Sequence, residues 1–305
     1  VVATALVVRC ADRYPLLSAI PGPCAPCVCS NAGVLQGCPF HAELRDPILW
    51  IKGRGVTAVK VEAFKGNEGA VFLHLEDNAL ETLPVGLFDG LRNPHGIHLS
   101  HNKLVGLSPR LFDGLGSLSF LFLNDNRIDA LPPGIFDALG SLEFLYLDHN
   151  RLVDLPPGVF DALDDLWGLE LGHNQIQSIP STTFRGLKGV VNIDISANNV
   201  SHPIEVGTFA NPNLRFVSLA HNAIRSVEAG AFGKSLEHVW LTGNNLTCVG
   251  LAGVDGALPS DAGCTDEGTC DALFGIAYFG DESCDVHTDP RYNTAECMWD
   301  GGDCE

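Results

Sequence analysis

Carboxylates and cysteines gather at the C-terminal end of this 305-residue chain. Residues 248–305 hold thirteen Asp and Glu but a single basic residue, Arg291, so this stretch carries −12 of the net charge of −19. The final residues, AECMWDGGDCE, place two carboxylates and two glycines between two cysteines. Glycines let the backbone turn so that carboxylates converge, and crowded carboxylates repel one another until a hard cation such as calcium binds. The alternative is a solvated acidic loop held only by disulfides.

Ten of the eleven cysteines form two clusters, one toward each end of the chain, and only Cys10 stands apart. This pattern indicates disulfides made in an oxidising compartment. The eleven are Cys10, Cys24, Cys27, Cys29, Cys38, Cys248, Cys264, Cys270, Cys284, Cys297 and Cys304. Zinc is the alternative for the Cys24/Cys27 pair, but no second Cys or His pair follows at the spacing that zinc sites use. We therefore expect disulfides.

The N-terminal run VVATALVVRCADRYPLLSA is apolar but far shorter than the ~20 residues of a membrane span. We expect residues 1–22 to be the remnant of a secretory leader. Its removal would take Cys10 away and leave an even number of cysteines. The alternative is an ordinary disordered or packed N-terminal segment. Two glycosylation sequons, at Asn199 and Asn245, fit a secreted chain.

An internal repeat of 24 residues fills the middle of the chain, in the frame L-x-L-x-x-N-x-L-x-x-L followed by a Phe. Its asparagines are Asn78, Asn102, Asn126, Asn150, Asn174, Asn198 and Asn222, with Asn244 after 22 residues. Arg54 holds the equivalent place in a weaker first repeat. A long amphipathic helix is excluded because LPPG interrupts the leucines. Alternating leucines instead predict short half-buried strands that stack into a parallel sheet over one shared core.

Two side chains of the frame have predictable roles. The Asn amide both donates and accepts, so it can satisfy backbone groups where the chain leaves each strand. The Phe side chains are expected to stack on the outer side of the core: Phe88, Phe112, Phe136, Phe160, Phe184 and Phe232. Phe209 falls one residue late, which predicts a local distortion after Asn198.

The frame resembles the extracellular leucine-rich repeats of the 24-residue type, and this resemblance implies an α/β solenoid, or horseshoe, with a parallel sheet on its concave face. Residues 23–48 resemble the family's N-terminal cap, which implies the disulfides Cys24–Cys29 and Cys27–Cys38. The expected order is a leader remnant at 1–22, this cap at 23–48, repeats at 49–250 and a disulfide-rich module at 251–305.

The expected ligand-binding residues lie on the concave face, to which the residues six, four and two positions before each Asn point. Phe120, Phe122, Phe144 and Tyr146 fall on two adjacent strands and should form one exposed aromatic patch outside the core. Its expected acidic border is Asp125, Asp148, Glu170 and Asp194. The alternative is that Phe120 and Phe144 tuck sideways between strands.

Four histidines precede repeat asparagines: His101, His149, His173 and His221. A metal column is one interpretation of this spacing. One His in each repeat does not converge on an ion, however, so we expect polar surface side chains at a position that tolerates many residues.

Residues 279–304 resemble the calcium-binding Notch-type repeat (LNR), most specifically in Cys297-x-W-D-G-G-D-Cys304. This resemblance implies calcium as the cofactor, with Asp281, Asp300 and Asp303 as ligands. It also implies three disulfides: Cys284–Cys304, Cys264–Cys297 and, by remainder, Cys270–Cys248. The family has six cysteines, and the fourth is missing here.

No nucleophile elbow, phosphate loop or metalloprotease helix is present, so an enzyme is not expected. The acidic charge makes nucleic acid and anionic membranes poor partners. The sequence predicts an extracellular module that binds a protein or glycan. The alternatives are the non-catalytic targeting region of a larger enzyme or receptor, and a structural matrix component.

Overall fold

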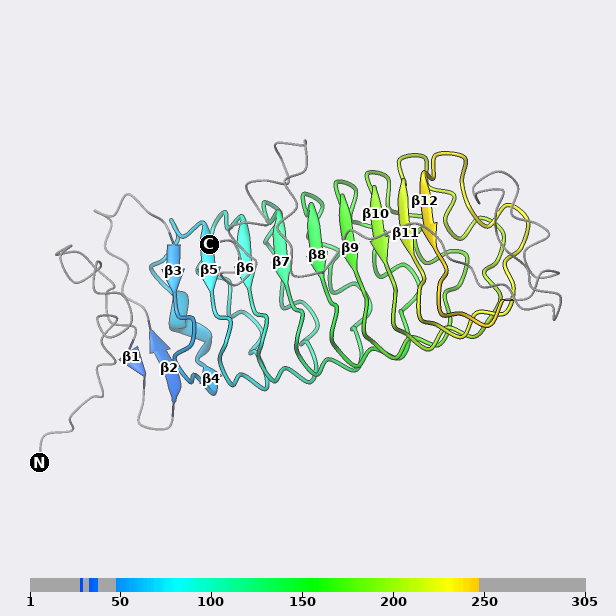
Figure 1. Cartoon of the computed structure of the whole chain (residues 1–305). Coiled ribbons are helices and arrows are strands. Elements are labelled where there is room, and N and C mark those ends of the chain that lie inside the picture. Colours follow the sequence, from blue (N-terminus) through cyan, green and yellow to red (C-terminus); the bar gives the residue numbers. More distant parts are fainter. Residues whose placement is uncertain (1–27, 30–32, 38–47, 247–305) are drawn as a thin grey trace, which may run out of the picture. The chain divides into compact units, whose positions relative to one another are not determined.

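The computed structural model describes residues 28–29, 33–37 and 48–246, and the fold of this part is a parallel β-solenoid (Figure 1). Nine three-residue strands pair side by side in one sheet, in the order β12-β11-β10-β9-β8-β7-β6-β5-β3. They are β3 (Ile48–Trp50), β5 (Phe72–His74), β6 (Gly96–His98), β7 (Phe120–Phe122), β8 (Phe144–Tyr146), β9 (Gly168–Glu170), β10 (Asn192–Asp194), β11 (Phe216–Ser218) and β12 (His238–Trp240).

A second, three-stranded sheet lies before the repeats. It contains β1 (Val28–Cys29), β2 (Val34–Gly37) and β4 (Ala58–Val59), with β1 antiparallel to β2 and β2 parallel to β4. A 3-10 helix, η3 (Val61–Phe64), follows β4. Of the cap cysteines, Cys29 lies in β1, whereas the expected partners fall outside the described residues.

The α/β class predicted from the sequence is correct in its parallel sheet but wrong in its helical half. Within the described residues η3 is the only helix. Between successive strands the chain forms consecutive tight turns, as in Ile135 N to Pro132 O (3.2 Å) and Asp137 N to Gly134 O (3.1 Å). Proline at 132 and 133 and a positive φ of 70° at Gly134 prevent these turns from joining into an α-helix.

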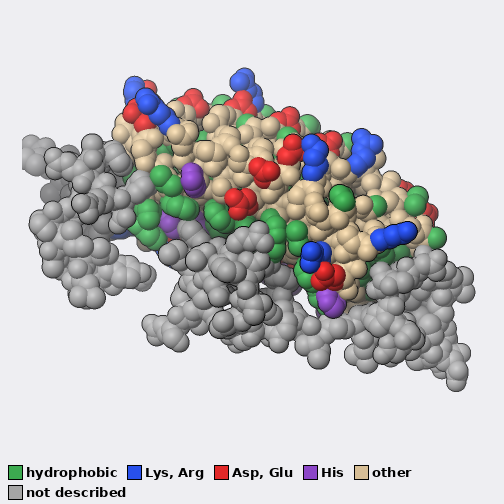
Figure 2. Space-filling view, turned by 90° about the horizontal axis from the view of Figure 1, so that it is seen from above, with side chains coloured by type: hydrophobic (Ala, Val, Ile, Leu, Met, Phe, Trp, Pro, Cys, Tyr) green, Lys and Arg blue, Asp and Glu red, His purple; other side chains and the backbone are tan. Residues whose placement is uncertain are grey.

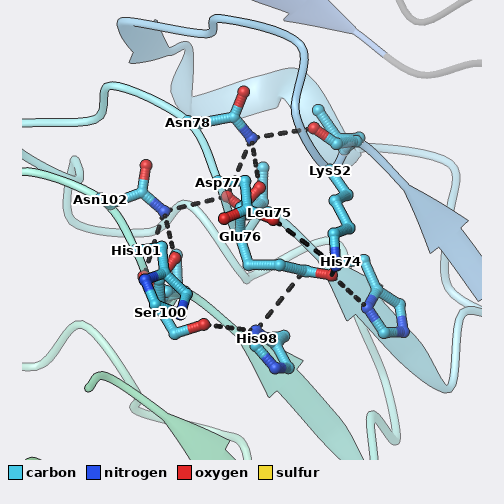
Figure 3. Close-up of polar contacts among 12 residues, drawn as sticks. Lys52, His74, Leu75, Glu76, Asp77, Asn78, His98, Ser100, His101 and Asn102 are labelled. Carbon is cyan, nitrogen blue, oxygen red and sulfur yellow. Dashed lines mark hydrogen bonds and ion pairs between the residues drawn. The ribbon is translucent and has the colours of Figure 1, made fainter. Parts of the chain in front are cut away.

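Each repeat asparagine bridges two neighbouring repeats, as the sequence predicts. Asn150 is typical: its Oδ1 accepts from Ile128 N (3.0 Å), and its Nδ2 donates to Leu123 O (2.9 Å) and Leu147 O (3.0 Å). Figure 3 shows the same arrangement around Asn78 and Asn102. These amides satisfy the backbone groups that each strand leaves behind when it ends.

The predicted phenylalanine stack is present and runs through the core, with successive ring centroids 5.5 to 6.4 Å apart. Phe64 begins it, a residue that the sequence reading did not include. Phe209 keeps its place between Phe184 and Phe232 despite falling one residue late. The chain there makes two isolated bridges, Ile204 to Val227 and Phe209 to Phe232, and Ile204, Phe209 and Val227 all stay buried in the core.

Candidate ligand-binding surface on the open face of the sheet

One face of the nine-stranded sheet covers the leucine core, and we call the other the open face. The parallel register places Phe120 opposite Phe144 and Phe122 opposite Tyr146. The ring centroids lie 5.5 Å and 4.7 Å apart, with interplanar angles of 7° and 9°. The four residues predicted as a ligand-binding patch therefore do lie together, on β7 and β8, and we call them the aromatic patch.

The expectation that this whole patch is exposed is wrong for Phe122, which is only 7% exposed. Its ring lies between the rings of His98 (4.5 Å) and Tyr146 (4.7 Å), and these neighbours cover both of its faces. Phe120, Phe144 and Tyr146 are half-buried. The sequence analysis placed these side chains outside the core, but Phe122 also contributes to packing, so we expect its truncation to destabilise the fold.

The alternative of sideways packing also holds in part. A Cβ added at Gly168 would meet the Phe144 ring at 3.0 Å, so this glycine makes room for Phe144 to lean toward β9. Trp167 contacts the same ring, with centroids 5.4 Å apart and planes tilted by 47°. Sequence reading missed Trp167 because it stands one position before the columns that face outward.

The patch continues a longer row of rings toward the first strand. Trp50 stacks on His74 (3.9 Å), His74 on His98 (5.8 Å), and His98 on Phe122 (4.5 Å). Trp50 is 52% exposed. Trp50 stands four residues before Arg54, which replaces the asparagine of the first repeat. The residue four positions before each asparagine was predicted to face outward, but that prediction was not applied to this repeat because the asparagine is missing.

Glu76 joins three repeats beneath this row (Figure 3). Its carboxylate lies 3.1 Å from His74 Nδ1, 3.5 Å from His98 Nδ1 and 3.8 Å from Lys52 Nζ. Burial alone would raise the pKa of Glu76, but the hydrogen bond from His74 and the neighbouring histidines hold it below its usual value. Burial lowers the pKa of His98 to about 4, so its ring is neutral at pH 7.

The predicted acidic border lies where it was expected, and three of its members have internal partners. Asp125 accepts from Asn124 Nδ2 (2.8 Å). Glu170 accepts from Asn192 Nδ2 (2.9 Å), and Asp194 accepts from Ser196 N (2.7 Å). Asp148 differs, because burial and the nearby charge of Asp125 raise its pKa to about 7. Asp148 therefore exchanges a proton in the physiological range.

The backbone conformation explains why histidine recurs before the repeat asparagines, and the sequence analysis did not predict this conformation. His101, His149, His173 and His221 all have a φ of 51–55°, the left-handed region in which Asp, Asn and His are enriched. The position therefore favours His and Asp, but it also accepts Ala197, which has the same φ of 51°. The rings of His149 and His173 stack at 4.2 Å. Across the part of the chain that the structure describes, no three His, Cys, Asp or Glu side chains are grouped as metal ligands.

The other predicted sites lie outside the described residues. These are the calcium ligands Asp281, Asp300 and Asp303 and the cysteines Cys24, Cys27, Cys38, Cys248, Cys264, Cys270, Cys284, Cys297 and Cys304.

In the view of Figure 2, acidic and basic side chains are interspersed over a largely uncharged surface. No helix in the described residues is long and apolar enough to cross a membrane.

Comparison with solved structures shows the same fold in three other proteins. The first is the TLR13–ssRNA13 complex, with a TM-score of 0.59, 24% identity, and coverage of 67% of this chain and 31% of that one. The Drosophila Toll–Spatzle complex gives 0.53 and 23%, covering 66% and 30%. The leucine-rich repeat domain of APL1B gives 0.51 and 19%, covering 66% and 63%.

The chain thus spans about a third of the first two of these proteins. A search of curated proteins by sequence found no match. The sequence does match the family described as "Leucine rich repeat" in five overlapping segments, 70–128, 95–152, 120–176, 141–200 and 168–223. These segments cover residues 70–223, half of the chain, and they coincide with the strands, asparagine bridges and phenylalanine stack described above. The chain is a member of the leucine-rich repeat family.

Proposed function

We propose that this protein is a non-catalytic, extracellular recognition module that binds a protein ligand on the open face of its sheet. The observation that carries the proposal is the aromatic patch, in which four stacked rings, three of them half-buried, lie beside carboxylates. Aromatic side chains with a polar rim are the usual composition of a binding hot spot. Strand side chains held by a rigid sheet also lose little entropy when a ligand binds.

The fold by itself does not choose the ligand, since the similar structures include complexes with an RNA and with a protein. The chemistry of this open face favours protein. Asp125, Asp148, Glu170 and Asp194 border the patch, and carboxylates repel the phosphates of nucleic acid. A glycan is the second chemical class that aromatic rings can bind, and the selection below distinguishes it by failing to yield peptide ligands.

The extracellular setting is supported by the clustered cysteines and by the sequons. Asn199 and Asn245 are both exposed, as glycan attachment requires. The protein is thus proposed to act outside the cell, alone or as the targeting region of a longer receptor or enzyme.

The test is a selection of 12-residue peptides from a random phage-displayed library against the immobilised full chain. The selected peptides are then titrated against Phe144→Ala and Tyr146→Ala. Each change is expected to weaken binding by roughly 2 kcal/mol, about 30-fold, because both remove part of the aromatic patch. Val85→Ala is the matched control, since Val85 is an exposed apolar residue (54%) outside the strands. Binding that tolerates both patch variants as well as it tolerates the control would overturn the proposal.

A further inference from the structure

A depression of about 460 Å³ lies beyond the C-terminal ends of strands β6 to β9, where the chain leaves the sheet. Two guanidinium groups, of Arg127 and Arg151, and two imidazole rings, of His149 and His173, help to line it. The two rings stack, with centroids 4.2 Å apart and planes within 8° of each other. Nitrogen donors thus gather at one place on a chain whose net charge is −19.

The two arginines belong to a row of basic residues, each of which directly follows a repeat asparagine. The row runs through three consecutive repeats as Lys103, Arg127 and Arg151. The backbone N–H of each member donates to the preceding repeat at 2.8–2.9 Å, so neighbours in the row are about 5 Å apart. The row ends on both sides, because the equivalent positions in the flanking repeats hold the uncharged Ala79 and Gln175.

The row carries positive charge that the described residues do not neutralise. All three side chains are exposed, and none forms an ion pair there. The Lys and Arg ion pairs in this part of the chain involve other residues: Lys52, Lys65, Arg92, Arg110, Lys188 and Arg215. Asp125 also lines the depression, but its carboxylate contacts His101 Nε2 (3.6 Å) and accepts from Asn124 Nδ2 (2.8 Å). The arginines are therefore free to bind an anionic group of a ligand.

A single carboxylate fits this site better than a long polyanion does. A guanidinium presents parallel N–H donors that match the two oxygens of a carboxylate. The row is only about 10 Å long, since it spans two strand spacings. The exposed carboxylates of Asp129 and Asp154 follow within three residues of the arginines. Further charges of a polyanion would meet these carboxylates and be repelled.

We propose that the depression takes an Asp or Glu side chain of the protein ligand, which Arg127 and Arg151 bind while an apolar residue of the same ligand lies on the aromatic patch. Arg151 follows Tyr146 by five residues, so the two contact points lie at most about 18 Å apart. This inference rests on the proposed function and adds the direction of the ligand. Its acidic residue points past the ends of the strands, because on the sheet it would meet Asp148 and Glu170.

The experiment uses the 12-residue peptides selected on the full chain, which span about 40 Å when extended and so reach both contact points. Peptides whose binding depends on Tyr146 should carry Asp or Glu within about six residues of their apolar anchor. The best peptide is compared with its amide counterpart, Asn for Asp or Gln for Glu, by calorimetry in about 0.15 M salt. We expect the amide to bind about 10-fold more weakly.

Variants of the protein then locate the carboxylate. Arg127→Gln and Arg151→Gln should each weaken the parent peptide about 10-fold and reduce the discrimination between acid and amide to under about 3-fold. Arg225→Gln is the matched control, since Arg225 is an exposed arginine that forms no ion pair in the described residues. It removes the same charge from the molecule and should change neither quantity.

Each other outcome decides against the proposal. Peptides that need Tyr146 but lack an acidic residue, or bind as well with the amide, would overturn the carboxylate site and leave the proposed function standing. Discrimination that survives in both arginine variants would overturn the assignment of Arg127 and Arg151. A heparin hexasaccharide that binds more tightly than the best peptide, and only while both arginines are present, would assign the depression to a sulfated glycan instead. A library that yields no peptide dependent on the aromatic patch would overturn both the site and the proposed function.

Discussion

At the scale of single residues, the open face holds ionisable groups whose titration is set by burial. The pKa of Asp148 is raised and the pKa of His98 is lowered, in opposite directions but for the same reason. Burial disfavours the charged form, so the Asp148 carboxyl tends to stay protonated and the His98 ring tends to stay neutral. Each displacement makes stability depend on pH.

For Asp148, the folded-state pKa of about 7 lies above the unfolded value of about 4. The folded state therefore holds a proton that the unfolded state has lost, and stability falls as the pH rises between these values. Asp148→Asn removes the burial cost of the charge. We expect it to raise the free energy of unfolding by about 1–3 kcal/mol at pH 8 and to change it little at pH 4. Urea denaturation at both pH values measures this, with Asp165→Asn as the control; equal effects at both pH values would contradict it.

For His98, the folded-state pKa of about 4 lies below the unfolded value of about 6.5. The unfolded state takes up a proton first, so stability is lost as the pH falls from about 6.5 to 4. We expect His98→Gln to flatten this part of the stability profile by about 1–3 kcal/mol. His202→Gln, at an exposed position, serves as the control and should leave the profile unchanged. The profile is measured by denaturant unfolding at half-unit pH steps, and a slope unaffected by His98→Gln would refute the assignment.

At the scale of elements, stability comes from interactions that cross from one repeat to the next. Three-residue strands are too short to be stable alone, and each one depends on its neighbours for a hydrogen-bond ladder and a shared core. The asparagine bridges and the phenylalanine stack are the two side-chain systems that provide this coupling. Both can be tested by a single truncation in the middle of the solenoid.

Asn150→Ala removes one acceptor and the donors to three carbonyls, those of Leu123, Leu147 and Asp148. The buried backbone groups left behind are cut off from water, so we expect a loss of about 3 kcal/mol in the free energy of unfolding. Gln175→Ala, at an exposed position in the next repeat, should lower the free energy of unfolding by less than about 0.5 kcal/mol. Thermal and denaturant unfolding of the two variants measures the difference, and similar stabilities would show that the ladder is not a coupling element.

Phe136→Ala opens a cavity in the middle of the stack, where the ring is fully buried and contacts Phe112 and Phe160. We expect it to cost about 3–5 kcal/mol. Phe232 lies at the end of the stack and is only partly buried. Within the phenylalanine stack it contacts one ring, that of Phe209. Phe232→Ala should therefore cost clearly less. Denaturant midpoints of the two variants test this order, and the reverse order would mean that the end of the stack contributes more than its middle.

At the scale of the whole molecule, we propose that the acidic C-terminal module binds calcium. The proposal rests on the LNR-like stretch with Asp281, Asp300 and Asp303, which lies outside the described residues. A small module with few large apolar residues needs disulfides and a metal to fold. In the full chain, millimolar calcium should protect the bonds of residues 248–305 from limited proteolysis, and chelator or Asp300→Ala should remove that protection. Cleavage at the same rate with and without calcium would reject the proposal.

The sequence by itself determined the repeat and everything that recurs with it. The interactions that build the solenoid join residues 24 or so positions apart, and those residues occupy the same place in a repeated frame. Strand pairs such as Phe120 with Phe144, the Asn150 bridges and the Phe136 stack could therefore be predicted from spacing alone. The positions of the aromatic patch and of its acidic border followed from the same rule.

The tertiary structure alone decided the properties that depend on non-identical neighbours. Phe122 is buried because its two neighbours on the adjacent strands, His98 and Tyr146, both have rings that stack on it. Asp148 has a raised pKa because its carboxyl is desolvated beside Asp125. A periodic frame says which side chains are adjacent. It does not say how two particular side chains share space and exclude water, and desolvation is what makes a carboxyl hold its proton or a ring lose its exposure.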